Sequence, residues 1–373
     1  GADRAVRVIR SDGTMPAFAP EPIFEKYGAA VDIGTTTLAA RLYDRAGALL
    51  AQAAAPNPQR IYGADVITRT EKSLAGERES LARCIREGID SLLRQMSAQA
   101  GIPPEAVDTV VLTGNTAMLY LLTARDVDCL SHAPFLADEL FGRYAEPEEL
   151  RLSAAPKARL YLPRCISAFV GADITSALVA SQICTRPESA LLADIGTNGE
   201  LALWHKGRLL CCSTAAGPVF EGATISRGMQ AGPGAIHRVT YENGKISCRT
   251  IESAPAAGIP DPEGHPYAAA GQERYLRRDA HPAGGRGSGC EGPDRLVIAG
   301  GFGSFLDLHS AACIGLYPPA LEIRARTIGN AALAGASMML LRGRYRQQAA
   351  ALAELAETVD LSASPVFREN YVE

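Results

Sequence analysis

The sequence predicts an α/β protein built from two similar lobes, and three observations support this. The phrase Asp-Ile-Gly-Thr at residues 32–35 recurs at residues 194–197. Each copy follows a short apolar run that is typical of a buried strand, and a return strand and a glycine turn follow each copy. Strands and helical segments then alternate in both halves. An internal duplication with its boundary near Thr185 explains the recurrence.

The elements expected in the first half follow from hydrophobic spacing. Apolar residues recur at i, i+3 and i+4 between Ile85 and Met96, which is typical of a helix, and Gly101 and two prolines end it. In order, we expect strands over 29–33 and 38–44, a helix over 64–100, a strand over 109–113, a helix over 116–123, a strand from 160, an acidic turn after a strand at 170–173, and a helix to 183.

The second half repeats this plan. Runs of apolar residues predict three consecutive strands, another strand before a glycine-rich turn, and two closing helices. The expected strands are 191–197 with its turn, 200–204, 209–213 and 295–298, and the expected helices are 328–342 and 347–357.

Composition changes define the domains that we expect. Residues 1–28 contain three prolines and little periodicity, so they are interpreted as a linker or N-terminal extension. The first lobe covers 29–185 and the second covers 186–373. Within the second lobe, proline, glycine and charged residues dominate 254–294, which predicts an insertion with little core.

Bulk composition excludes several function classes. The 373 residues are 47% hydrophobic and 21% charged, with a net charge of −4 and a pI near 6.0, which gives no support for nucleic-acid or membrane binding. No apolar run is long enough for a bilayer span and no signal peptide is visible, so we expect a cytoplasmic protein. The nine cysteines contain no Cys-x-x-Cys pair, which favours reduced thiols over a metal or iron–sulfur site; Cys290 is the one that merits a reactivity test.

The repeated turns are candidates for phosphate binding. Glycine and hydroxyl residues at the tip of a strand–turn–strand unit can hold phosphate by backbone N–H and O–H groups. One such turn would be interpreted as an ordinary hairpin, but two copies favour the phosphate site. Asp32 and Asp194, at the mouths of the turns, can orient a hydrated Mg²⁺. The phosphate-binding candidates are Gly34, Thr35, Thr36, Thr37, Gly196, Thr197, Asn198 and Gly199.

Further acids and glycines extend the predicted site. Asp173 can orient the water that attacks a terminal phosphate, or it can cap a helix, and both readings stay open. Gly217 and Glu221 could approach phosphate and a ribose or Mg²⁺-bound water, against the alternative of a helix-starting turn. Gly114-Asn115-Thr116 is better explained as a helix cap. The turn at Gly300, Gly301, Phe302 and Gly303 permits close approach of an adenosine. The six histidines show no ligand spacing, and no Cys–His catalytic arrangement is recognisable.

These phrases resemble the five ordered motifs of the ASKHA superfamily of sugar and acetate kinases, chaperone ATPases and actin. The matching segments are 32–37, 171–173, 194–200, 300–303 and 329–336. The resemblance implies two ribonuclease-H-like lobes with a nucleotide cleft between them. More narrowly, the phrases at 113–118, 170–175, 194–200, 216–223, 227–231 and 300–304 resemble the ATPase domain of reductive activators of corrinoid proteins.

This second resemblance implies a function. In such activators, binding and hydrolysis of ATP with Mg²⁺ accompany electron transfer from an N-terminal [2Fe–2S] domain to a Co(II) corrinoid (cobalamin-type) protein of a methyltransferase system, which restores Co(I). The chain lacks that cysteine cluster, so no iron–sulfur cluster is expected in it, and the ferredoxin-type donor is either separate or part of a longer protein. A homodimer is one option for its assembly.

A second departure and two rivals accompany this expectation. The family continues through a Gly-Cys-Gly-Ser-Gly phrase and a helical subdomain. Residues 287–290 match the phrase only weakly, and the helices that would cover the adenine are missing from the expected elements. One rival function is a small-molecule kinase of the same superfamily, with Asp173 as its base. The other is a nucleotide-sensing scaffold without turnover.

Overall fold

The structure is a computed structural model, and it describes residues 22–196, 199–214, 233–234, 236–242, 245–251, 292–301, 306–313 and 316–361. The chain divides into two compact units. The first comprises residues 1–215, 293–305 and 324–373, and the second comprises 216–292 and 306–323. Both six-stranded sheets belong to the first unit, and so do the predicted residues Asp32, Asp173 and Asp194, whereas the predicted residues Gly217 and Glu221 fall in the second unit.

The first sheet has the strand order β3-β2-β1-β4-β6-β5. Strands β1 to β3 are consecutive and antiparallel, β4 and β6 continue the sheet in parallel on the far side of β1, and β5 pairs antiparallel with β6. The bounds are β1 Tyr27–Ile33, β2 Thr37–Asp44, β3 Leu49–Pro56, β4 Val107–Gly114, β5 Arg143–Tyr144 and β6 Arg159–Leu162.

The second sheet repeats this arrangement, with the order β13-β12-β7-β8-β9-β14. Strands β7 to β9 are consecutive and antiparallel, and β12 and β13 are parallel beyond β7. The bounds are β7 Ala190–Ile195, β8 Gly199–His205, β9 Arg208–Thr214, β12 Arg295–Ala299, β13 Ala325–Thr327 and β14 Ala356–Thr358. The predicted α/β class with two duplicated lobes is confirmed by this shared topology.

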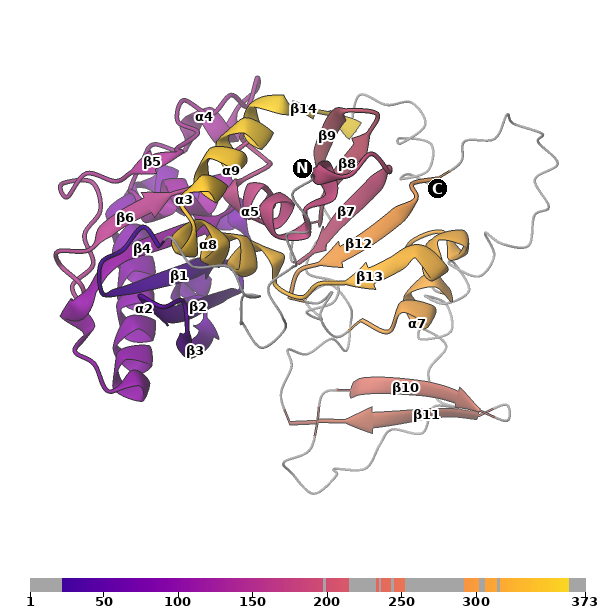
Figure 1. The fold of residues 1–373 in the computed structure, drawn as a ribbon, viewed down its shortest axis with the longest axis horizontal. Helices are drawn as coiled ribbons and strands as arrows, with labels where there is room; N and C mark the ends of the chain where they lie inside the picture. Colours follow the sequence, from indigo (N-terminus) through magenta and orange to yellow (C-terminus); the bar gives the residue numbers. More distant parts are fainter. Residues whose placement is uncertain are drawn as a thin grey trace. The chain divides into compact units, whose positions relative to one another are not determined.

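The two sheets share a hydrophobic core built on α5 (Ala172–Ser181) and α8 (Ala331–Leu341), which Figure 1 shows between them. Helix α8 packs against β1 and β4 of the first sheet, whereas α5 packs against α8 and against β7 and β8. The two helices cross where both carry residues with small side chains, Ser176 on α5 and Gly335 on α8. A Cβ on Gly335 would overlap the backbone of Ser176, so only glycine permits this approach. The crossing brings the C-terminal ends of β1 and β7 toward the same helix termini.

The other face of the first sheet is covered by α2 (Arg78–Ala100) and α3 (Thr116–Leu122). Residues Ala29 and Val31 face this core while Ala30 faces the core shared with the second sheet, so alternate residues of β1 are buried on opposite sides. Helix α2 ends at Gly101, whose φ of 68° is the left-handed conformation favoured by glycine.

Several shorter elements complete the chain. Helix α9 follows α8 and packs on α5, and β10 and β11 form an antiparallel hairpin in the second unit. In the remaining bounds, η marks a short 3₁₀ helix or, at η2, a π helix. They are η1 Pro58–Ile61, α1 Val66–Lys72, η2 Ser73–Glu77, η3 Pro104–Ala106, α4 Asp128–Ser131, η4 Ile183–Thr185, β10 Ile236–Glu242, β11 Lys245–Thr250, α7 Leu308–Cys313, η8 Pro319–Arg324 and α9 Arg344–Leu355.

Two sequence-based expectations need correction. The predicted helix over 64–100 is interrupted at 73–77, where Gly76 has a φ of 99°. No strand precedes the acidic turn at 170–173: β6 ends at Leu162, and residues 163–171 form a loop whose backbone closes by bonds from Ile166 and Ser167 to the Val170 carbonyl. Pro163, which has no N–H to donate, marks the point where the strand stops.

Six strands of the structure were not expected from the sequence: β3, β5, β10, β11, β13 and β14. Most of the predicted insertion at 254–294, including Cys290, lies outside the described residues, as does most of the predicted extension at 1–28. None of the helices in the described parts of the chain is both long and apolar enough to cross a bilayer.

Candidate functional site

The turn between β1 and β2 is built from Gly34 to Thr37 and is braced by a buried asparagine. The Gly34 N–H donates to the Thr37 carbonyl at 3.0 Å, and a Cβ on Gly34 would lie 2.7 Å from that oxygen. Asn57 donates its side-chain amide to the Gly34 carbonyl at 2.8 Å and its backbone N–H to the Thr36 carbonyl at 2.7 Å. The turn is therefore held rigid from outside, as a preorganised phosphate loop requires.

The hydroxyl residues of this turn differ in exposure. Thr35 is buried, Thr36 is half-buried and Thr37 is exposed. The predicted phosphate contacts of Thr36 and Thr37 are thus compatible with solvent access, whereas Thr35 contributes to the packing of the turn.

Four carboxylates gather where β1, β7 and α5 end or begin. Asp32 and Asp194 are the penultimate residues of β1 and β7, and Asp173 lies in the first turn of α5. Glu200 lies on β8 directly opposite Asp194, so the two side chains share one face of the sheet. Glu200 is buried, and the three aspartates keep a partly exposed edge.

Burial, and for three of these acids the charge of their neighbours, raises their pKa values. Burial raises the pKa of Asp32 to about 6, and the hydrogen bond from Asn330 offsets part of this rise. Burial and the charge of Asp32 raise the pKa of Asp194 to about 7. Burial, followed by the charges of Asp194 and Asp32, raises the pKa of Asp173 to about 8. The pKa of Glu200 is also raised, by burial and by Asp173 and Asp194.

Asn330 joins helix α8 to this cluster. Its side-chain amide donates to Asp32 Oδ2 at 2.7 Å, and its Oδ1 accepts from the Leu333 N–H at 2.7 Å as the N-cap of α8. One side chain therefore both starts α8 and orients the carboxylate of Asp32, across 298 residues of sequence.

The glycine turn after β12 comes close to Asp194. A Cβ on Gly300, whose φ is 97°, would lie 2.6 Å from Asp194 Oδ1, while Gly301 has open space around its Cα. The Gly300 N–H donates to the Gly329 carbonyl at 3.1 Å. The turn predicted for adenosine thus begins beside the predicted magnesium carboxylate.

The remaining predicted site residues stand as follows. Gly196 and Gly199 flank the tip of the β7–β8 turn, and the Gly199 carbonyl accepts from the Thr214 hydroxyl at 2.8 Å. The other predicted contacts lie outside the described residues: Thr197, Asn198, Gly217, Glu221, Phe302 and Gly303.

Two helix-cap questions raised by the sequence are answered. Asn115 caps α3 by accepting from the Met118 N–H at 2.8 Å, which confirms its structural role. Asp173 is not the cap of α5, because the N-cap residue is Gly171; the Asp173 carboxylate accepts from the N–H of Ile174 at 2.8 Å instead.

The carboxylates fit a hydrated cation better than a directly ligated one. Within the described ranges, no three His, Cys, Asp or Glu side chains converge closely enough to be direct metal ligands, and no Lys or Arg side chain pairs with any of the four acids. Repelling acids with raised pKa values favour a neutralising cation, and Mg²⁺ commonly keeps several waters and binds through few carboxylates. Asp32 and Asp194 are therefore suited to hold Mg²⁺ through water.

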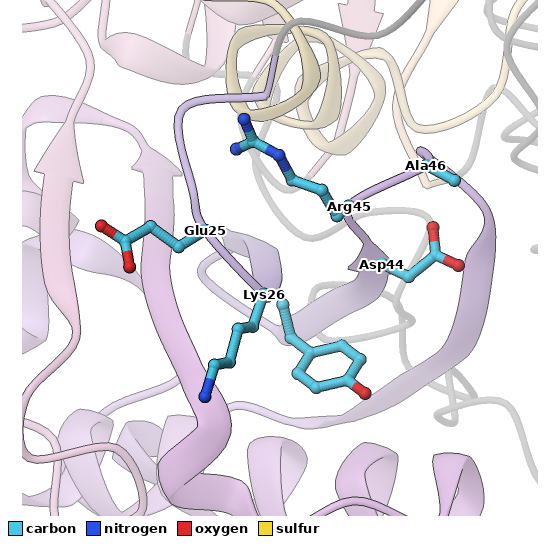
Figure 2. Close-up of a pocket in the computed structure, with 6 residues that line it drawn as sticks. Glu25, Lys26, Asp44, Arg45 and Ala46 are labelled. Atoms are coloured by element: carbon cyan, nitrogen blue, oxygen red, sulfur yellow. The ribbon is translucent and has the colours of Figure 1, made fainter.

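A separate hollow lies at the other end of β1, and Figure 2 shows residues that line it. It has a volume of about 450 Å³ and is lined by residues 25–27 and by the turn at 44–46. Tyr27 and Asp44, which line it, are paired at the first residue of β1, whereas Asp32 is near the last. The hollow is thus separate from the carboxylates.

Profiles of two regions of one protein family match most of the chain. "RACo middle region" matches residues 27–186, and "C-terminal domain of RACo the ASKHA domain" matches 188–261 and 286–373. The chain belongs to the RACo family.

Individual relatives agree with this assignment. The corrinoid activation enzyme RamQ of Eubacterium limosum is 30% identical over 437 residues, a match covering 98% of this chain and 73% of RamQ. The [Co(II) methylated amine-specific corrinoid protein] reductase of Methanosarcina barkeri is 27% identical over 225 residues, covering 58% of this chain and 41% of the reductase.

A solved structure has the same fold. The structure titled "Reductive activator for corrinoid,iron-sulfur protein" matches with a TM-score of 0.76 and 27% identity, over 93% of this chain and 65% of that one. The chain thus spans only part of the RACo-family proteins that it matches.

Three residues of the candidate site were not singled out from the sequence. Glu200 stood inside the recognised phrase at 194–200 and was not assigned a role, although the antiparallel return strand places it opposite Asp194. Asn330 stood inside the motif at 329–336, and its position before a small-residue helix was a usable cap signal. Asn57 carried no local signal beyond its place between two prolines.

Proposed function

We propose that this protein is an ATP-dependent reductive activator of a corrinoid protein, restoring Co(I) from Co(II) in a methyltransferase system. The observation that best supports the proposal is RACo-family membership over both halves of the chain. Two relatives carry the names corrinoid activation enzyme and Co(II) corrinoid protein reductase. The substrate partner is therefore a corrinoid protein, and ATP with Mg²⁺ is the cofactor.

The carboxylate cluster supports the ATPase part of the proposal. Bound Mg²⁺ would supply the positive charge that neutralises the phosphates and the acids. Asp32 and Asp194 would hold it through water, and Asn330 fixes the orientation of Asp32 by its 2.7 Å hydrogen bond. The turn at Gly34–Thr37 and the turn after β7 hold the phosphates with backbone N–H and hydroxyl groups.

Asp173 is suited to position the attacking water. It projects from the first turn of α5 and is close enough to Asp32 and Asp194 to feel both charges. Its raised pKa means that it retains a proton near neutral pH in the absence of cation, and neighbouring positive charge would lower that pKa and free the carboxylate to accept a proton.

Coupling to the partner is assigned to movement of the two lobes. We assign the lobes to residues 29–185 and 186–373, with α8 as the element of the second that packs on β1 and β4 of the first. Closure around nucleotide would alter the partner-facing surface. The electron comes from a ferredoxin-type donor encoded outside these 373 residues.

The test is hydrolysis of Mg·ATP by the purified chain, with and without a Co(II) corrinoid protein. Wild type is expected to hydrolyse ATP faster when the corrinoid protein is present, and Asp194→Ala to lose hydrolysis while remaining folded. Asp126→Ala is the matched control, because Asp126 is exposed and pairs with Arg78 away from the cluster.

Each rival function has its own outcome in this experiment. Phosphoryl transfer to a small metabolite would identify a kinase, and nucleotide binding without turnover would identify a sensing scaffold. Unchanged hydrolysis in Asp194→Ala would overturn the site assignment.

A further inference from the structure

A Cys–His–Glu arrangement lies on the second compact unit. His309 and Cys313 are four residues apart on α7, so they share one face of the helix. The His309 Nε2 atom lies 3.5 Å from the Cys313 sulfur. The other ring nitrogen, Nδ1, lies 3.1 Å and 3.3 Å from the two carboxylate oxygens of Glu322, which comes from η8. Two elements thus align three reactive side chains.

The contacts assign a role to each group. A carboxylate can only accept a hydrogen bond, so Glu322 accepts from Nδ1–H and thereby assigns the tautomer of His309. Nε2 of that tautomer carries the lone pair, and this lone pair faces the thiol. The order nucleophile, base and orienting acid is the arrangement by which thiols are activated in proteins.

Accessibility separates Cys313 from the buried thiols. Cys313 is exposed, and the His309 side chain is 74% exposed, so a small molecule can reach the sulfur. By contrast, burial raises the pKa of the buried Cys165 and Cys211 and of the half-buried Cys184 to about 12, which makes these three thiols unreactive.

We propose that Cys313 is a modification site at which the thiol exchanges with low-molecular-weight disulfides. His309 Nε2 takes the proton as the Cys313 sulfur attacks one sulfur of the disulfide. The new bond joins Cys313 to that sulfur, the original S–S bond breaks, and the departing thiolate receives the proton from His309. Cys313 is oxidised to a mixed disulfide, the reagent is reduced to one thiol, and excess thiol reverses the step.

The test is the rate of mixed-disulfide formation with oxidised glutathione, followed by intact-protein mass spectrometry and peptide mapping of the full chain. We expect the fastest-reacting cysteine to be Cys313. Cys313→Ser should remove this fast phase. His309→Asn should slow it at least about 10-fold, which is less than the roughly 10²–10⁴-fold typical of general-base catalysis because the site is exposed. Glu322→Ala should slow it less, and Glu322→Gln, which keeps an acceptor for Nδ1–H, should restore much of the rate.

Two controls keep the outcome decisive. Cys84→Ser removes a half-buried thiol whose pKa burial and Glu87 raise, and should leave the fast phase unchanged. Cys290→Ser tests the cysteine that the sequence singled out, and it too should leave the phase unchanged. A fast phase that survives in Cys313→Ser, or wild-type rates in both His309→Asn and Glu322→Ala, would overturn the proposal.

Discussion

Replacing Asn330 tests how helix α8 is tied to the carboxylate cluster. The side chain makes two hydrogen bonds of 2.7 Å, one to the carboxylate of Asp32 and one from the backbone N–H of Leu333 at the start of α8. Asn330→Ala removes both bonds. Asn330→Ser keeps a side-chain oxygen for the helix cap and removes only the donor to Asp32.

The magnitude follows from these two bonds. Loss of an N-cap costs about 1 kcal/mol. Loss of a hydrogen bond to a charged group costs about 1.5–3 kcal/mol, and the partial exposure of Asp32 favours the lower value. The free energy of unfolding should therefore fall by about 2.5 kcal/mol in Asn330→Ala and by about 1.5 kcal/mol in Asn330→Ser.

The pH dependence has a definite sign. Burial raises the pKa of Asp32, the amide of Asn330 lowers it by favouring the charged carboxylate, and the net pKa is about 6. The contribution of the amide is therefore larger above pH 6 and smaller below it, so the loss in both variants should grow as pH rises through that value.

The assay is urea unfolding of wild type and variants at pH 5 and pH 8 without Mg²⁺, together with KM and kcat for Mg·ATP. Asn115→Ala is the matched control, because Asn115 caps α3 at 2.8 Å. It should lose about 1 kcal/mol at both pH values. If Asn330→Ala behaves like Asn115→Ala at both pH values, the bond to Asp32 contributes nothing and the reasoning fails.

Two further predictions concern the cluster and its glycine turn. The pKa values of Asp32, Asp173 and Asp194 are higher in the folded protein than the ordinary value of 3.8, so these acids bind protons more tightly when the protein is folded. The free energy of unfolding of the Mg²⁺-free protein should therefore fall as pH rises from about 4 to about 8. Asp194→Asn should remove part of this loss and raise the free energy of unfolding at pH 8 by on the order of 1–2 kcal/mol. Mg²⁺ should stabilise wild type more than the variant. Thermal unfolding across this pH range measures both effects, and a wild-type stability that does not change with pH would contradict the raised pKa values. Gly300→Ala should destabilise more than Gly207→Ala, since both have positive φ, at 97° and 80°, but only the Cβ at 300 meets other atoms, including Asp194 Oδ1 at 2.6 Å. Equal urea midpoints for these two variants would show that Gly300 has room.

Much of the first-order architecture could be predicted from periodicity. Apolar runs located β1, β2, β4, β7, β8, β9 and β12, because buried strands need continuous or alternating apolar residues. Helix α2 and its end at Gly101 followed from i, i+4 spacing and a glycine stop. The short strands β13 and β14 carry too few residues for such a signal, and pairing with β12 and β9 creates them.

The sequence supplied three of the four clustered carboxylates. Asp32 and Asp194 were singled out because their phrase recurs, and Asp173 because it was expected to follow a strand, which the structure does not contain. Glu200 needed the cross-strand register, which places it opposite Asp194. The Cys313–His309 pair was missed although i, i+4 spacing on a helix was available, since α7 is only six residues long and η8 supplies the third member, Glu322.

The sequence by itself determined the duplicated α/β plan, the two acid-and-glycine turns and the RACo-type phrases, because periodicity and repeated motifs are local properties of the chain. Only the tertiary structure decided which acids share one environment and what orients them. The hydrogen bond from Asn330 to Asp32 and the close approach of Gly300 to Asp194 join residues far apart in the chain. Their distances arise from the packing of α8 against β1 and from the parallel pairing of β12 with β7, which no local pattern encodes.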